Sequence, residues 1–78
     1  ITFVDVYIPI ERMQDWSNSL LVLNNIPYMK KINIIGLRGD VGKVNLGFQG
    51  TNNTFFNILN EKGYKLKQVN DEFILIKK

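Results

Sequence analysis

The chain has 78 residues, 45% of them hydrophobic and 12% aromatic, which suits one folded domain with room for one sheet and about two helices. The absence of cysteine excludes disulfides, thiolate chemistry and cysteine metal sites, and the absence of histidine removes the commonest general base and transition-metal ligand. Ten basic and seven acidic residues give a net charge of +3. Lysine supplies eight of the ten, so arginine contacts to phosphate or guanine are scarce.

We expect residues 1–78 to form a single domain that belongs to a longer chain. The first residue is Ile1 rather than methionine, and it already lies in a predicted strand. No apolar run approaches the ~20 residues of a membrane-spanning helix, and nothing resembles a signal peptide. The sequence therefore predicts no membrane span in this segment, and it does not reveal the compartment directly.

A strand and then a helix are predicted for the first 25 residues. Apolar residues alternate along residues 1–10, which is typical of a strand with one buried face formed by Val4, Val6, Ile8 and Ile10. In residues 11–25 apolar side chains recur at helical spacing, and Ile26-Pro27 ends that pattern. The predicted stripe of this helix consists of Met13, Trp16, Leu20 and Leu23, flanked by Ile10 and Leu21.

Two further strands, residues 28–37 and 43–50, are predicted on either side of a glycine-rich segment. The first would place Ile32 and Ile34 on one face and Asn33, Ile35 and Leu37 on the other. The second would turn Val44, Leu46 and Phe48 inward, and Lys43, Asn45, Gly47 and Gln49 outward.

The last third of the chain predicts a helix and a strand pair. Residues 51–63 combine the capping side chains of Thr51–Thr54 with a stripe of Phe55, Ile58 and Leu59, and Gly63 ends the helix. Residues 64–78 hold two strand-like runs around Asn70-Asp71, which suits a tight hairpin turn. This order predicts an α+β, two-layer ferredoxin-like split βαβ sandwich, βαββαβ, whose last strand is open to doubling into a hairpin. Its sheet would be antiparallel, with both helices on one face.

The stretch GLRGDVGK, residues 36–43, is open to three interpretations. A phosphate-binding loop would need glycine where Leu37 stands and a hydroxyl where Val44 stands, followed by a helix rather than a strand. The Arg-Gly-Asp tripeptide lacks any fold context for adhesion. We therefore interpret the stretch as a hairpin. Gly36 would mark the end of the strand and permit a bend or bulge, residues 38–42 would form a five-residue loop, and Lys43 would open the next strand outward.

An RNA-recognition motif has the same βαββαβ order, and Val6-Tyr7-Ile8 resembles its first-strand signature. Its third strand must also present aromatic rings to the bases. Here the outward positions of that strand are Lys43, Asn45, Gly47 and Gln49, and its aromatic residue Phe48 would point inward. Half of the stacking platform is missing, so nucleic-acid binding is an alternative rather than the leading hypothesis.

No catalytic, cofactor-binding or metal-binding residues are predicted, and we expect a protein that is not an enzyme. The seven carboxylates are scattered, and the pair at helical spacing, Glu11 and Asp15, lies at a helix start where both favour the helix dipole. We interpret Trp16 as a core residue on the helical stripe.

Several short motifs resemble a family of uncharacterised proteobacterial proteins known only as a domain of unknown function. They are Asp15-Trp16, Ile26-Pro27, Leu46-x-Phe48-x-Gly50-Thr51 and Gly63-Tyr64-x-Leu66. The resemblance implies a non-enzymatic domain of a larger bacterial protein, with the cell envelope or periplasm favoured over the cytoplasm. It supplies no active-site residues.

The leading hypothesis is a non-catalytic protein–protein interaction or assembly module. In the predicted fold one sheet face is open, and it would present Phe3, Tyr7, Ile35 and Leu37, rimmed by Asn33, Asn45 and Lys43. The remainder of the parent chain, another protein or a second copy would cover it, unless a bulge turns Ile35 and Leu37 inward. A small-molecule sensor of the ACT type is a second alternative. The lysines at 65, 67, 77 and 78 would protect the sheet edge.

Overall fold

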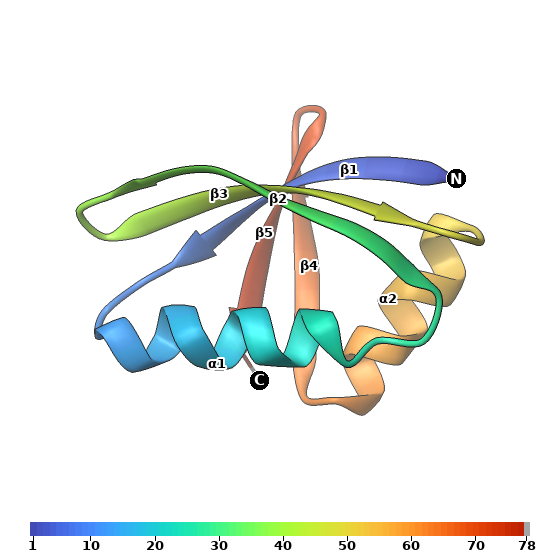
Figure 1. The fold of residues 1–78 in the computed structure, drawn as a ribbon, viewed down its shortest axis with the longest axis horizontal. Helices are drawn as coiled ribbons and strands as arrows, with labels where there is room; N and C mark the ends of the chain where they lie inside the picture. Colours follow the sequence, from blue (N-terminus) through green and yellow to red (C-terminus); the bar gives the residue numbers. More distant parts are fainter. Residues whose placement is uncertain (78) are drawn as a thin grey trace.

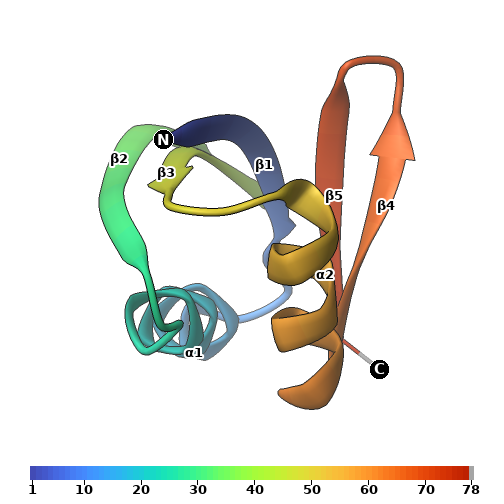
Figure 2. The same cartoon turned by 90° about the vertical axis from the view of Figure 1, so that its right-hand side faces the viewer.

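The computed structural model describes residues 1–77, which form seven elements. In chain order these are β1 (Thr2–Pro9), α1 (Met13–Asn24), β2 (Met29–Arg38), β3 (Val41–Phe48), α2 (Asn52–Glu61), β4 (Tyr64–Val69) and β5 (Glu72–Lys77). The five strands make one sheet in the order β2-β3-β1-β5-β4. Both helices lie under the same face of this sheet, which curves around them (Figures 1 and 2). The predicted α+β two-layer arrangement is therefore present.

The prediction of a purely antiparallel sheet is wrong at one place. β1 pairs with β5 in parallel, through Val6 opposite Phe73 and Tyr7 opposite Ile74, whereas the other three pairings are antiparallel. The doubling of the last strand into a hairpin is confirmed, and its turn lies at Asn70, which has a positive φ of 57°. The fold is thus roughly ferredoxin-like, with β5 inserted between β1 and β4.

The apolar content of the two last strands explains which of them takes the inner position. β5 has the sequence EFILIK and contributes the buried side chains of Phe73 and Leu75, whereas β4 has the sequence YKLKQV. A central strand is covered on both edges and favours apolar residues, while an edge strand tolerates lysine. The chain therefore reverses at Asn70 and returns β5 beside β1.

The core lies between the sheet and the helices, and it confirms the predicted alternation of β1 and β3. The inward side chains of β1 and β3 are less than 10% exposed, namely Val4, Val6, Ile8, Val44, Leu46 and Phe48. From α2, the Phe55 ring stacks on Phe48 with their centroids 4.5 Å apart, and Leu59 is fully buried. Burial of these apolar surfaces is the main source of stability in a domain of this size.

The predicted stripe of α1 is only partly right. Trp16 and Leu23 are buried, but Met13 and Leu21 are 64% and 61% exposed, and Ser19 is buried instead. The inward line of the helix runs through Trp16, Ser19 and Leu23 because these positions repeat at i, i+3 and i+7. Leu21 lies off that line, and Met13 lies in the first turn.

Trp16 lies directly against the backbone of β3. A Cβ atom placed on Gly42 would overlap Cζ3 of the indole and come within 2.8 Å of its Cε3 atom. Real Cβ atoms do not approach aromatic carbons so closely, so this packing requires glycine at position 42. The contact fixes α1 under the β3 side of the sheet and confirms Trp16 as a core residue.

The hairpin between β2 and β3 is tighter than predicted. Its turn has two residues, Gly39 and Asp40, rather than the five-residue loop over 38–42, because Arg38 and Val41 still pair across the ladder. Gly39 has a φ of 57°, which suits a two-residue hairpin turn. Of the bend or bulge predicted at Gly36, the structure shows a bulge, as a register shift between Ile34 and Gly36. The strand does not end at Gly36, since β2 continues to Arg38. The carbonyl of Asp40 accepts the Ile10 N–H at 2.7 Å, which ties the turn to the end of β1.

Replacing Gly42 with alanine is expected to lower the free energy of unfolding by about 1–3 kcal/mol, because the new methyl group collides with Trp16. Urea unfolding followed by the fluorescence of Trp16 measures this loss. Gly36→Ala is the matched control, since a Cβ at Gly36 would have no atom within 4 Å. Equal stability of the two variants would contradict the packing described.

Candidate functional site on the open sheet face

The sheet face opposite the helices is uncovered, and we call it the open face. Side chains that are paired across strands point to the same side of a sheet, so the register defines its members. They are Phe3, Asp5, Tyr7 and Pro9 of β1; Lys31, Asn33, Ile35 and Arg38 of β2; Val41, Lys43, Asn45 and Gly47 of β3; Lys65, Lys67 and Val69 of β4; and Glu72, Ile74 and Ile76 of β5.

Two aromatic rings stand near the centre of the open face, both on β1. Phe3 is 56% exposed and lies over Gly47, where an added Cβ would come within 2.7 Å of the ring. Tyr7 is half-buried, and the Lys43 ammonium lies 5.2 Å from the centre of its ring. Both rings thus rest on the neighbouring strand β3, which leaves their remaining surface available for contact.

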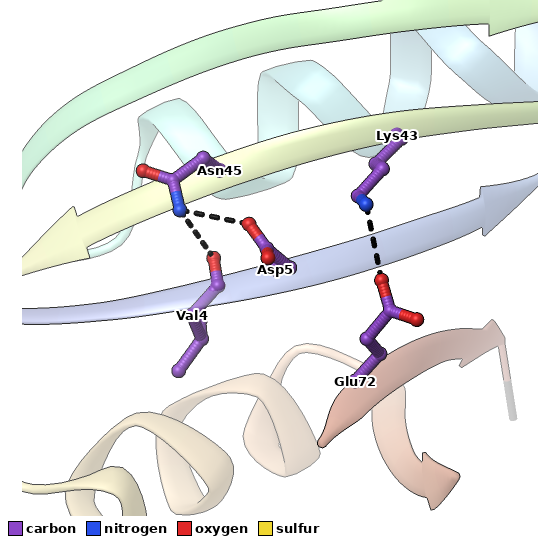
Figure 3. A network of polar contacts seen from close by, with 5 residues as sticks. All are labelled: Val4, Asp5, Lys43, Asn45 and Glu72. Carbon is purple, nitrogen blue, oxygen red and sulfur yellow. Dashed lines mark hydrogen bonds and ion pairs between the residues drawn. The ribbon is translucent and has the colours of Figure 1, made fainter. Parts of the chain in front are cut away.

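Polar side chains connect the three central strands across the open face (Figure 3). The Lys43 ammonium of β3 lies 3.1 Å from Oε2 of Glu72 in β5. The Asn45 amide of β3 donates to the Asp5 carboxylate of β1 at 2.8 Å, and its hydrogen bond to the Val4 carbonyl is 3.5 Å long. Both carboxylates of the open face therefore already have partners within the sheet.

The ion pair shifts both of its members toward their charged forms. Hydrogen bonds from Lys43 and then from Tyr7 lower the pKa of Glu72 below its ordinary value of 4.5. Hydrogen bonds to Glu72 and then to Tyr7 raise the pKa of Lys43 above its ordinary value of 10.5. The two side chains are 33% and 37% exposed, so water screens the pair strongly.

The positive charge of the chain is concentrated on this surface. The open face carries five basic side chains, Lys31, Arg38, Lys43, Lys65 and Lys67, against two carboxylates, Asp5 and Glu72. That excess of +3 equals the net charge of the whole chain, and the remaining residues hold five charges of each sign. The lysines of β4 and the basic residues of β2 flank the aromatic centre from opposite edges of the sheet.

A hollow of about 500 Å³ indents the open face beside the β2–β3 hairpin. Three of the four residues predicted to bind a partner line it, namely Tyr7, Ile35 and Leu37. Arg38, Val41 and Lys43 also line it, so its apolar surface is bordered by two cationic groups.

The bulge in β2 decides how Ile35 and Leu37 are placed. Ile35 lies within the register shift, so Ile35 and Gly36 together oppose Lys43 on the open face. Leu37 pairs with Gly42, whose missing side chain would point to Trp16 beneath the sheet. The two residues therefore do not share one face as the simple alternation predicts. Leu37 lies on the helix side of the β2–β3 hairpin, but it is 49% exposed and still lines the hollow.

The sequence identified the aromatic part of the site but missed much of its charge. The outward position of Phe3 and Tyr7 was predicted from the alternation of apolar residues along one strand. Lys65, Lys67 and Ile74 join the same surface only because β5 lies beside β1, and no local pattern indicates that pairing. Arg38 was assigned to a loop, whereas the structure places it in β2.

The structure also bears on nucleic-acid stacking, acid–base catalysis, metal binding and membrane insertion. The open-face positions of β3 carry no aromatic ring, and Phe48 is only 3% exposed in the core. Asp15 caps α1, since its Oδ2 accepts the backbone N–H groups of Glu11 and Arg12 at 3.1 and 3.0 Å. Over residues 1–77, no group of three or more acidic side chains is arranged to hold a metal ion. No helix in that range is long and apolar enough to cross a membrane.

Comparisons with known proteins give no family assignment. No protein-family model matches the chain. No similar curated protein was found, and no solved structure matches it. The resemblance to the proteobacterial family consequently extends no further than an α+β domain with the element order β-α-β-β-α-β-β.

The ion pair between Lys43 and Glu72 predicts a specific dependence of stability on pH. The pKa of Glu72 is lower in the folded state than in the unfolded state. Its charge therefore stabilises the fold above the unfolded-state pKa, and this stabilisation is lost as the pH falls through the folded-state pKa. Wild type should therefore exceed Glu72→Gln in stability at about pH 7, and this difference should disappear at about pH 2–3. Urea unfolding at both pH values measures it. An unchanged difference at acidic pH would show that the charge of Glu72 contributes nothing.

Proposed function

We propose that this chain is a non-catalytic protein interaction domain, and that its open face binds an acidic segment of a separate partner protein. The observation that carries the proposal is the concentration of the whole net charge around the exposed ring of Phe3, the half-buried ring of Tyr7 and an apolar hollow. Aromatic residues and arginine are enriched where interfaces gain most of their energy, and complementary charge directs the encounter.

The hollow suggests how such a segment would be held. An apolar side chain of the partner would enter between Tyr7 and Ile35, where little polar surface competes for it. Carboxylates before and after that side chain would reach Arg38 on one side of the hollow and Lys67 farther along the sheet. The two carboxylates of the open face, Asp5 and Glu72, would repel the segment little because Asn45 and Lys43 already hold them.

Charge argues against a second copy as the occupant. Two open faces brought together would place five basic side chains against five more, with only two carboxylates on each side. Like charges across an interface cost free energy at ordinary salt. Self-association through this face is therefore disfavoured, although its apolar area alone would permit it.

A single-stranded nucleic acid is less suited to this surface than an acidic protein. Its phosphates would find the lysines, and its bases would need aromatic rings at short intervals. The two rings of the open face lie four positions apart on one strand, which is roughly 13 Å. The neighbouring strand β3 adds no third ring. Nucleic-acid binding is accordingly an outcome that the experiment must distinguish.

The wider role follows from the same proposal. We place the domain in a larger bacterial protein, as the family resemblance implies, where it would contribute attachment rather than chemistry.

The test uses a fluorescently labelled peptide of alternating glutamate and leucine, with a glutamine–leucine peptide and a 12-nucleotide oligothymidine as comparisons. Fluorescence anisotropy at low salt should show the acidic peptide binding most tightly, and added salt should weaken it. Arg38→Glu should weaken binding about tenfold or more, which corresponds to about 1.4 kcal/mol. Lys62→Glu is the matched control, because Lys62 caps α2 on the helix side and undergoes the same change of charge.

Each result decides between the occupants. Equal binding of the acidic and the glutamine peptides, or no effect of Arg38→Glu, would contradict the proposal. Tighter binding of the oligonucleotide than of the acidic peptide would identify nucleic acid as the ligand of the open face. Light scattering is run in parallel, and a dimer that Tyr7→Ala with Leu37→Asp abolishes would identify a second copy as the occupant instead.

A further inference from the structure

A second hollow, of about 310 Å³, lies mainly on the helix side of the sheet. It is lined by the end of β1 and the start of α1 together with the first residue of β4 and the end of β5. In Figure 2, α1 lies to the left of α2, and β4 and β5 lie to the right of α2. The side chains that matter for its chemistry are Glu11, Asp15, Ser19, Tyr64, Leu75 and Lys77. This volume is at the lower end of the range for small-molecule sites.

Two largely buried residues that carry hydroxyl groups line this hollow. Ser19 is only 5% exposed and Tyr64 only 8%. Among residues 1–77 neither hydroxyl makes a hydrogen bond to another side chain or to the backbone. No buried side-chain oxygen or nitrogen of these residues is both sealed from solvent and unpartnered. Both hydroxyl oxygens are therefore open to solvent, and because both residues line the hollow, a ligand bound there can satisfy them.

The charged groups of the hollow are arranged asymmetrically. Glu11 and Asp15 lie together at the start of α1, and Lys77 lies at the end of β5. Both backbone hydrogen bonds to Asp15 use Oδ2, which leaves Oδ1 for another donor. The lining thus carries two carboxylates against one ammonium group, which favours a ligand with positive charge.

The apolar part of the lining limits the kind of cation. Leu75 is buried at 3% exposure, and it gives the hollow a hydrocarbon surface beside the hydroxyls. A bare metal ion gains nothing from such a surface, whereas a short carbon chain does. The two carboxylates and two hydroxyls offer acceptors to the three N–H donors of a primary ammonium group.

We propose that this hollow binds a small primary ammonium compound, with its NH₃⁺ group between Glu11 and Asp15 and its carbon chain on Leu75. A ligand that also carries a carboxylate would place that group at Lys77. Free amines and amino acids share the ammonium chemistry, so the experiment distinguishes these two sources. The site is separate from the hollow of the open face, because the two hollows share no lining residue.

The test measures ¹H–¹⁵N chemical-shift changes of the folded chain on titration with n-butylamine, with 6-aminohexanoate and with hexanoate. The two ammonium compounds should give saturable shifts at residues 11–19 and 75–77, and hexanoate should not. Glu11→Gln should weaken both about tenfold or more. The matched control is Glu61→Gln, which makes the same change at the end of α2, outside the hollow, and should leave both affinities unchanged.

Two further variants complete the design. Lys77→Met should weaken 6-aminohexanoate but not n-butylamine if an amino acid is the natural source, whereas equal affinities for both would identify simple amines. Ser19→Ala removes one acceptor without changing charge, so it should weaken both ligands even if Glu11→Gln unfolds. Absence of saturable shifts with both ammonium compounds would overturn the proposal, as would equal binding of hexanoate or indifference to both Glu11→Gln and Ser19→Ala.

Discussion

The rest of the structure depends on the contact between the Trp16 indole and the β3 backbone at Gly42. No side chain of β3 stands between the indole ring and the strand backbone at this point, so the ring packs directly on β3. Once Gly42 faces the helix, alternation obliges Val44, Leu46 and Phe48 to do the same, because side chains of a strand repeat with a period of two. The positions between them are then left facing solvent, and they become the open face.

The second helix, α2, packs under the same face and likewise fixes which residues of β3 and β5 point inward. Phe55 stacks on Phe48 at the end of β3, and Phe56 meets Phe73 of β5 edge to face with centroids 5.3 Å apart. These contacts fix β5 as an inner strand, and its alternate residues Ile74 and Glu72 emerge on the open face. The helix side therefore determines which charges gather above the sheet. It also leaves an uncovered space at the start of α1, where the largely buried residues Ser19 and Tyr64 lie.

Local patterns were enough to predict most elements of the fold. The alternation of β1 and β3, the bulge at Gly36 and the turn at Asn70 each depend on a few neighbouring residues, and each is present. The parallel pairing of β1 with β5 was missed because it depends on competition between two distant strands for one central position. The same dependence hid the contribution of Lys65 and Lys67 to the candidate site. Leu37 was misplaced because one extra residue in a bulge reverses the parity of everything after it.

Ser19 illustrates a different limit of sequence reasoning. A serine among the exposed polar residues of a helix gives no signal of burial, and it became part of the helix side only because it shares a line with Trp16 and Leu23. The hydroxyl of Tyr64 gave no signal either, since its neighbours across the hollow come from the other end of the chain. The open face and the second hollow thus both arise from the way the two halves of the sheet meet. Neither can be recognised from a contiguous sequence motif.

The central claim is that the net positive charge of this protein is concentrated on one face of its sheet. Paramagnetic relaxation by an anionic and by a cationic cosolute tests it most directly, through the methyl protons of three side chains with comparable exposure. Ile35 and Val69 lie on the open face and are 59% and 43% exposed, whereas Leu21 lies on α1 and is 61% exposed. The account predicts a higher ratio of anionic to cationic enhancement at Ile35 and Val69 than at Leu21. Equal ratios at all three residues would contradict it.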